Sequence, residues 1–291
     1  MKRKVAVIVD APAAVPQDLI DRYDIGIAPL HAIVDGVDYP ETEVDMEWLL
    51  KRLEQKTDVP TTSATSIGEF LVAYEAAAER GESIVSLHMT GKFTKTYENA
   101  LEASRMFIEK HPSVRIEAID TETVEAGETP IAIEAARLAW EGADFETVVA
   151  RTYQVRDAMC SLYCFDTLFF RDKGGRIFKA KPWAESEGNS SAGFKAMIEV
   201  DHSTDGTVQL VARARSKKQL IARMASIAAD KVGTGKLSGS IVHIRAEEDA
   251  RCLKRLLEEK VDVESLTISH GLAVTAIQNG LGFVVFGFHN V

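Results

Sequence analysis

Val5-Ala6-Val7-Ile8-Val9-Asp10 is the stretch that decides the fold class of this 291-residue chain. An uninterrupted apolar run rich in β-branched residues and closed by an acidic residue is typical of a strand buried on both faces, as in parallel sheets. Outward from it, strands and helices alternate, which predicts a parallel sheet with right-handed crossovers. The further strands expected in this half are 26–34, 84–89 and 114–119, and the helices are 15–23, 46–53, 66–80, 97–110, 131–140 and 145–155.

The second half of the chain has a different pattern. Two apolar runs flank Asp201–Gly206, and the Asp205-Gly206 pair predicts an antiparallel hairpin. We therefore expect two α/β domains, a parallel-sheet N-terminal domain (1–158) and a mixed-sheet C-terminal domain (159–291). The strands expected in the second domain are 159–165, 194–200, 208–213, 240–244 and 265–269, with helices at 217–231 and 247–259; the segments 272–277 and 283–288 close the chain.

Composition narrows the functional classes. A hydrophobic fraction of 46% suits a globular core, and a formal net charge of −10 argues against a nucleic-acid-binding protein. No apolar run reaches the ~18 residues of a spanning helix, so we expect no membrane insertion. The three cysteines, Cys160, Cys164 and Cys252, are read as reduced thiols of a cytoplasmic protein. The histidines are scattered without metal-ligand spacing, so no metal site and no cofactor are expected.

Two hydroxyl-rich segments are the first candidates for a ligand site. Thr61–Ser66 and Thr90–Thr96 each lead into the amino terminus of an expected helix, and the second follows a strand. Unpaired N–H groups at such helix ends suit an anion, and ligands of open α/β sheets bind beyond the carboxyl ends of strands. Taken singly, either segment is more simply explained as an ordinary N-cap.

Two basic features are further candidates. In Lys173-Gly174-Gly175-Arg176-Ile177, the glycine pair can turn the chain and aim Arg176 at a carboxylate or phosphate; a helix C-cap explains it equally well. Arg213, Arg215 and Lys217 form either a solvated helix start or a docking patch. Known nucleophile and nucleotide motifs are absent: Gly91-Lys92 is not a P-loop, and no G-x-S-x-G elbow occurs.

These motifs, in this order, resemble the DegV family of bacterial fatty-acid-binding proteins along nearly the whole chain. Pro60-Thr61-Thr62-Ser63 is similar to the family's Pro-x-Thr-Ser segment, and Thr94-Lys95-Thr96-Tyr97 to its Ser-Gly-Thr-Tyr. Asp166-Thr167-Leu168 with the Gly-Gly-Arg segment resembles its most recognisable stretch. Gln278-Asn279-Gly280-Leu281-Gly282 stands where the family has His-x-Gly-Pro-Gly.

The resemblance implies a non-catalytic carrier that binds a long-chain fatty acid between two α/β domains. The hydroxyls of Thr62 and Thr94 would hold the carboxylate, with backbone N–H help near Lys95. The acyl chain would lie in an apolar tunnel of the first domain, where each buried methylene contributes about 0.8 kcal/mol. Some family members present the acid to a fatty-acid kinase, which makes such a kinase a candidate partner. The expected ligand-binding residues are Thr62, Ser63, Thr94, Lys95, Arg176 and Gln278, and the expected partner-binding residues are Arg213 and Arg215.

Three departures from the family pattern bear on ligand choice. Ala11 replaces a serine, Lys95 a glycine beside the head group, and Gln278 a histidine. Two other functions stay open at this point. An enzyme acting on a phosphorylated or carboxylated small molecule would use Lys95, Arg176 and Gln278 in a polar pocket without a tunnel. A protein-interaction module would instead use the basic patch.

Overall fold

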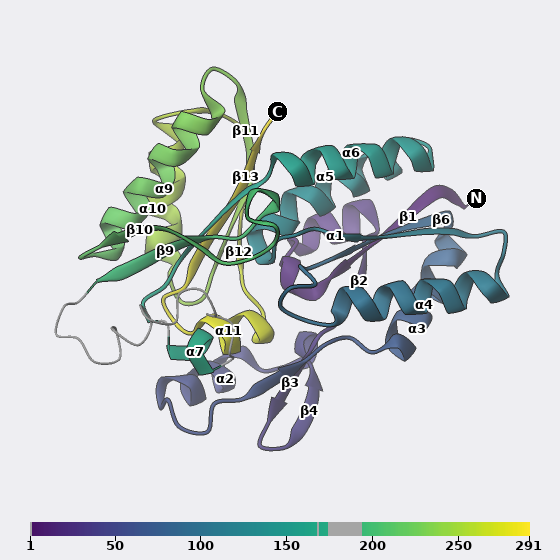
Figure 1. Cartoon of the computed structure of the whole chain (residues 1–291), viewed down its shortest axis with the longest axis horizontal. Helices are drawn as coiled ribbons and strands as arrows, with labels where there is room; N and C mark the ends of the chain where they lie inside the picture. Colours follow the sequence, from purple (N-terminus) through teal and green to yellow (C-terminus); the bar gives the residue numbers. More distant parts are fainter. Residues whose placement is uncertain (1, 168, 174–193) are drawn as a thin grey trace.

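The computed structural model describes residues 2–167, 169–173 and 194–291 and contains two large sheets and one small one (Figure 1). The N-terminal sheet has the strand order β2-β1-β6-β7, and all of its pairings are parallel. The expected parallel sheet is thus confirmed. Its strands are β1 (Arg3–Asp10), β2 (Gly26–Ala28), β6 (Gly81–His88) and β7 (Arg115–Asp120).

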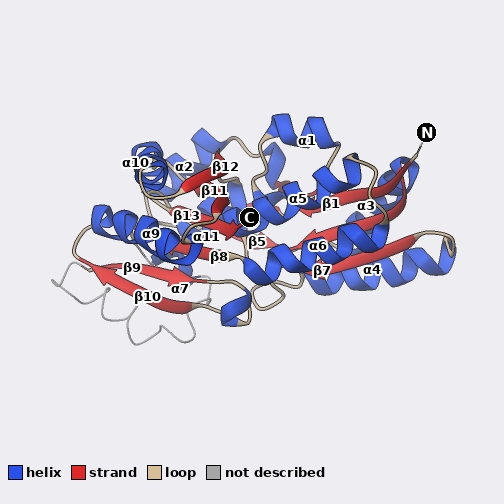
Figure 2. Ribbon diagram, turned by 90° about the horizontal axis from the view of Figure 1, so that it is seen from above, coloured by secondary structure: helices blue, strands red, loops and turns tan. Residues whose placement is uncertain are grey.

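Helices cover both faces of this sheet (Figure 2). Helices α3 (Ile67–Arg80) and α4 (Thr96–Lys110) pack on one face, and α5 (Glu128–Trp140) and α6 (Phe145–Ala158) on the other. The alternate residues Val5, Val7 and Val9 join the α5–α6 side, whereas Ala6 and Ile8 join the α3–α4 side. Since successive side chains of a strand point to opposite faces, this stretch has to be apolar throughout. In the described ranges, every helix is too short or too polar to cross a bilayer.

The expected single strand at 26–34 is wrong. Strand β2 ends at Ala28, and β3 (His31–Val34) belongs to a separate three-stranded sheet. Pro29 lies between them and has no N–H to donate to a ladder, which ends β2. Strand β3 pairs antiparallel with β4 (Val37–Pro40) and with β5 (Thr61–Ser63). The first hydroxyl-rich segment therefore begins as an edge strand and not as a loop.

The C-terminal sheet is mixed, as expected, with the strand order β10-β9-β8-β13-β11-β12. Only its β11–β12 pairing is parallel among the described strands. The expected hairpin is β9–β10, joined through a short 3-10 turn, with positive φ at Asp205 and Gly206. The strands are β8 (Cys160–Cys164), β9 (Lys195–Glu199), β10 (Gln209–Ala214), β11 (Lys236–His243), β12 (Asp262–His270) and β13 (Val284–Asn290). Helices α9 (Lys217–Val232) and α10 (Glu247–Glu258) pack on one face. Of the two segments that close the chain, 272–277 leads into and forms most of helix α11 (Ala273–Asn279), and 283–288 leads into β13.

The other face of the mixed sheet packs against the N-terminal region. A shared core joins Leu30 and Leu49 to Phe165 and Phe283 across the two halves. Strand β13 approaches the 3-10 turn η3 (Glu125–Gly127) so closely that a Cβ on Gly287 would lie 2.2 Å from the Ala126 carbonyl oxygen. The predicted boundary at 158/159 falls between α6 and β8 and remains a prediction.

Candidate ligand site at the junction of the two halves

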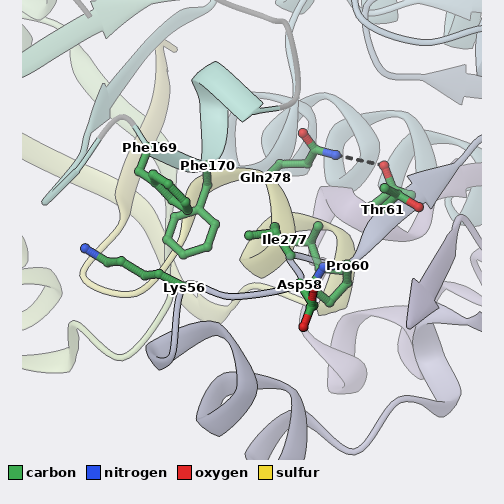
Figure 3. Close-up of a pocket in the computed structure, with 10 residues that line it drawn as sticks. Lys56, Asp58, Pro60, Thr61, Phe169, Phe170, Ile277 and Gln278 are labelled. Atoms are coloured by element: carbon green, nitrogen blue, oxygen red, sulfur yellow. Dashed lines mark hydrogen bonds between the residues drawn. The ribbon is translucent and has the colours of Figure 1, made fainter. Parts of the chain in front are cut away.

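A cavity of about 690 Å³ lies between the segment 56–62, helix α7 (Phe169–Lys173) and helix α11 (Figure 3). Its size is in the range of about 300–1,000 Å³ typical of small-molecule sites. Its lining contains both apolar and polar residues, which suits a ligand that is itself part apolar and part polar. The apolar lining residues are Val59, Pro60, Phe169, Phe170 and Ile277, and the polar ones are Lys56, Asp58, Thr61, Thr62 and Gln278.

Thr62 and Gln278, 216 residues apart in sequence, meet in the lining of this cavity. Pairing of β5 with β3 sets Thr62 opposite Ala32, and the buried helix α11 carries Gln278. The Gln278 Nε2 donates a hydrogen bond of 2.8 Å to the Thr62 Oγ1. The Gln278 Oε1 is buried and has no hydrogen-bond partner. Leaving such a group unpaired costs about 1–3 kcal/mol, and because this oxygen is an acceptor, only a hydrogen-bond donor can satisfy it.

Ser63 is next to Thr62 but is not among the residues that line the cavity. Its partner in the β3 ladder is His31, whose ring nitrogens lie 2.7 Å from Asp38 and 2.6 Å from Glu69. Burial opposes the charged form of His31, but hydrogen bonds to the two carboxylates outweigh it and raise the pKa of the imidazole. This end of β5 is thus tied to α3 by an ion pair, which positions the strand that carries Thr62.

The second hydroxyl-rich segment lies between β6 and α4 and caps that helix. The Thr94 Oγ1 lies 2.9 Å from the Thr96 Oγ1 and accepts a weaker bond from the Thr96 N–H. Lys95 is the exposed N-cap residue of α4. The Asn99 Nδ2 donates a bond of 2.8 Å to the Thr65 carbonyl oxygen, which joins this helix start to the segment after β5. The two segments are therefore linked, but neither Thr94 nor Lys95 lines the cavity beside Thr62.

The basic residues predicted to bind a ligand or a partner differ in where the structure places them. Arg176 lies in 174–193, outside the described residues. Arg213 and Arg215 are exposed, at the end of β10 and just before α9. Lys217 does not belong to an open patch, because its Nζ lies 2.7 Å from Asp249 and 2.5 Å from the Gly282 carbonyl oxygen.

A buried arginine beside the cavity was missed by the sequence analysis. Arg171, in α7 next to the lining residue Phe170, is 2% exposed, and its Nε donates a bond of 2.7 Å to Asn279 Oδ1. Asn279 Nδ2 in turn donates a bond of 2.6 Å to Glu125. Burial lowers the pKa of Arg171, and the nearby carboxylate of Glu125 opposes that shift. A charge inside the apolar pattern Phe-Phe-Arg was the available signal, since a buried arginine needs partners.

A second set of buried, hydrogen-bonded polar side chains lies at the ends of β1 and β6. The His88 ring lies 2.9 Å from Asp10 and 2.8 Å from Ser86, an arrangement that resembles a catalytic triad. All three residues are 0% exposed, so no substrate reaches the Ser86 hydroxyl. The Asp10 carboxylate also accepts the Met89 N–H at 3.0 Å. The hydrogen bonds among Asp10, His88 and Ser86 therefore stabilise the packing of the ends of β1 and β6.

Fold and cavity together define a two-part α/β protein with an amphipathic ligand cavity at the junction of its halves. A family model described as "Uncharacterised protein, DegV family" matches residues 4–289, and the chain belongs to this family. A DegV domain-containing protein of Clostridium perfringens is 29% identical over 266 residues, 90% of each chain.

Two solved structures share the fold over nearly the whole chain. The DegV family protein of Thermus thermophilus, described by its fatty acid binding, has a TM-score of 0.87 and 23% identity, covering 99% of this chain and 100% of that one. The family member of Ruminococcus gnavus, described with vaccenic acid, has a TM-score of 0.85 and 21% identity, covering 97% and 99%.

Proposed function

We propose that this protein binds a long-chain fatty acid in the cavity beside Thr62 and Gln278, and that it acts as a carrier without catalysis of its own. The observation that carries the proposal is one cavity of about 690 Å³ whose lining combines two groups able to donate hydrogen bonds, the Thr62 hydroxyl and the Gln278 amide N–H, with the apolar side chains of Phe169, Phe170 and Ile277. The family members from Thermus and Ruminococcus, described with a bound or binding fatty acid, support the choice of ligand.

The Thr62 hydroxyl and the Gln278 amide would hold the carboxylate. Both can donate a hydrogen bond, and charge-assisted bonds to a carboxylate are about twice as strong as neutral ones. The acyl chain would lie against Phe169, Phe170 and Ile277, where burial contributes about 0.8 kcal/mol per methylene. These residues belong to the second half of the chain, so this placement differs from the first-domain tunnel that the family resemblance implies. The tail would then supply most of the affinity, and the two polar groups its direction.

Thr94, Lys95 and Ser63 take a supporting role in this proposal. The bond from Asn99 to Thr65 joins the Thr94 segment to the strand that carries Thr62. Thr94 is not among the residues that line the cavity, so the proposal assigns it no contact with the carboxylate. For the enzyme alternative, the cavity offers Lys56 and Asp58 as its only titratable lining residues in the described part of the chain.

The test is binding of oleate to protein freed of lipid, with native mass spectrometry of the untreated protein alongside. Thr62→Val removes the hydroxyl at nearly constant volume and should weaken binding roughly tenfold, the value of one hydrogen bond to a charged group. Thr147→Val, on the exposed start of α6, is the matched control and should bind as wild type. Absence of an acyl ligand from the untreated protein, together with no binding of added oleate, would contradict the proposal.

We also propose a fatty-acid kinase as the partner, in the cytoplasm. The exposed pair Arg213 and Arg215 supports a docking patch, and the three cysteines, which form no disulfide, agree with a reducing compartment. Reversing both charges to Glu should abolish phosphorylation of the bound acid by the kinase while oleate binding persists. Arg223→Glu, exposed further along α9, is the control. Equal loss in the control, or loss of oleate binding in the double variant, would exclude a specific patch.

A further inference from the structure

A second cluster of side chains lies at the ends of β11 and β12. His243 and His270 are the last residues of these parallel strands and are register partners across them. Glu247 is the first residue of α10, which begins just after β11. The loop from strand to helix thus brings a carboxylate over two imidazoles. The carboxyl ends of parallel strands are where ligands of open α/β sheets bind.

The ligand atoms of the three side chains all lie within 4.8 Å of one another. The His270 Nε2 lies 3.3 Å from the Glu247 Oε1, and the two imidazole rings are 4.3 Å apart at 64°. Two ligands of a tetrahedral zinc, each about 2.1 Å from the ion, are separated by roughly 3.4 Å. The cluster therefore needs little rearrangement to close on one ion.

We propose that His243, Glu247 and His270 bind one divalent transition-metal ion of the zinc class. Two imidazoles and one carboxylate form the donor set of many three-ligand zinc sites, which keep a further position open for water or another ligand. The simplest competing account is a surface ion pair between His270 and Glu247, whose side chains are 67% and 46% exposed. That account does not involve the buried His243, whose Nδ1 accepts a long hydrogen bond of 3.5 Å from the Ala246 N–H and whose Nε2 is left for an ion.

The surroundings leave room at the open position. A cavity of about 440 Å³ is lined by Glu247 and His270 together with Met46 and Leu50 of helix α2 (Met46–Glu54). The ion would thus lie where the C-terminal sheet meets α2 of the N-terminal region. Arg245, the cation among the described lining residues, is paired with Glu47 at 2.8 Å and Glu54 at 2.6 Å. Outside this lining, the charges of Arg251 and Lys217 also act on His243.

Another set of possible ligands competes with this one. Cys160, Glu199 and Asp201 also have ligand atoms within 4.8 Å of one another. There, however, Lys231 lies 3.1 Å from Glu199, and the Asp201 carboxylate already accepts bonds from Ser161 and Ser203. A cation beside the site and carboxylates already in use disfavour a metal. We therefore place the ion at the histidine pair.

The experiment uses the full chain without a histidine tag, stripped with a chelator and titrated with Co²⁺, whose visible spectrum reports coordination, and then with Zn²⁺ in competition. We expect one equivalent per chain, without a thiolate charge-transfer band. His270→Ala and Glu247→Gln, both at exposed side chains, should each weaken Zn²⁺ binding roughly tenfold or more. Zn²⁺ should raise the Tm of the wild type and not of His270→Ala.

Glu248→Gln, the exposed neighbour, is the matched control and should bind as wild type. Binding unchanged in His270→Ala, or no stoichiometric binding in the wild type, would overturn the proposal. So would a thiolate band that disappears in Cys160→Ser, because it would move the ion to the other cluster. None of these readouts depends on a bound fatty acid.

Discussion

Two pairs of parallel strands end in similar chemistry and differ in access. Asp10 and His88 end β1 and β6, and His243 and His270 end β11 and β12. The first pair is 0% exposed, with Ser86 and the Met89 N–H completing its hydrogen bonds. In the second pair, the His270 side chain is 67% exposed to solvent. Neighbouring strand ends bring polar side chains close together in both places. Where these side chains are buried, they stabilise the fold; where one of them is exposed to solvent, they can bind a ligand.

The sharpest test of this difference removes one side chain from each pair. Asp10→Ala leaves His88 and the Met89 N–H buried without their acceptor, and should lower the free energy of unfolding by about 5 kcal/mol. His270→Ala in the absence of metal should change it by less than about 0.5 kcal/mol. Urea denaturation at neutral pH measures both. Similar losses in the two variants would show that both strand ends are structural.

A buried acid between the two regions makes stability depend on pH. Burial raises the pKa of Glu41 to about 8, and its Oε2 accepts the Val274 N–H at 3.2 Å. From the ordinary pKa of 4.5 up to about 8, the unfolded chain loses this proton while the folded chain keeps it, so stability is full below pH 4.5 and falls as pH rises toward 8.

Glu41→Gln should abolish this contribution. Between pH 5 and pH 8, the wild type should lose about 4 kcal/mol more than the variant. Urea denaturation at both pH values measures the difference. Glu43→Gln, the exposed neighbour, should follow the wild type. Parallel pH profiles for wild type and Glu41→Gln would mean that Glu41 is ionised in the folded protein.

The junction itself should tolerate no added methyl group. In Gly287→Ala, the new Cβ would meet the Ala126 backbone oxygen at 2.2 Å, and neither backbone can give way cheaply. We expect a loss of about 3 kcal/mol in the free energy of unfolding. In Gly68→Ala, where the nearest atom lies at 3.9 Å in the first turn of α3, the change should be neutral or slightly stabilising. An equally small change in the free energy of unfolding for Gly287→Ala would mean that β13 and η3 lie farther apart than in the structure.

The smallest effect is expected at the ion pairs of Arg245. Its bonds to Glu47 and Glu54 join the β11 end to α2, but all three side chains are well exposed. Arg245→Gln should cost less than about 1 kcal/mol, and the difference from wild type should shrink in high salt. Thermal unfolding at low and high salt measures it. A larger loss of stability that does not depend on salt would indicate that the Arg245 side chain also contributes by packing against its neighbours.

The local patterns in the sequence were sufficient for the two-sheet fold. Val5–Val9 alternates between two helical layers, so a wholly apolar run correctly predicted a sheet covered on both faces. Pro29 indicates that 26–34 forms two strands, because proline cannot donate to a strand ladder. The apolar residues on both sides of it nevertheless favoured a single strand. The third sheet could not be predicted, because β3, β4 and β5 are short and pair over long separations.

For the candidate site, the family motifs selected Thr62 and Gln278, which the structure brings together. They could not show that Thr94 lies apart from this cavity, since its distance depends on how α4 packs against α3. Arg171 was missed because it begins a run of three charged residues, Arg171-Asp172-Lys173, a pattern typical of an exposed segment. The assignment of the six ligand-binding residues as a set stays a prediction.

The close approach of Gly287 to Ala126 also bears on how fast a ligand can leave. A hinge between the halves would have to part a backbone-to-backbone contact and a shared apolar core in one step. Such an opening would have an activation barrier close to that of unfolding. Ligand exchange should therefore depend on small displacements of α7 and α11 at the cavity mouth. Dissociation rates should then vary with the residues of those helices and stay nearly independent of global stability.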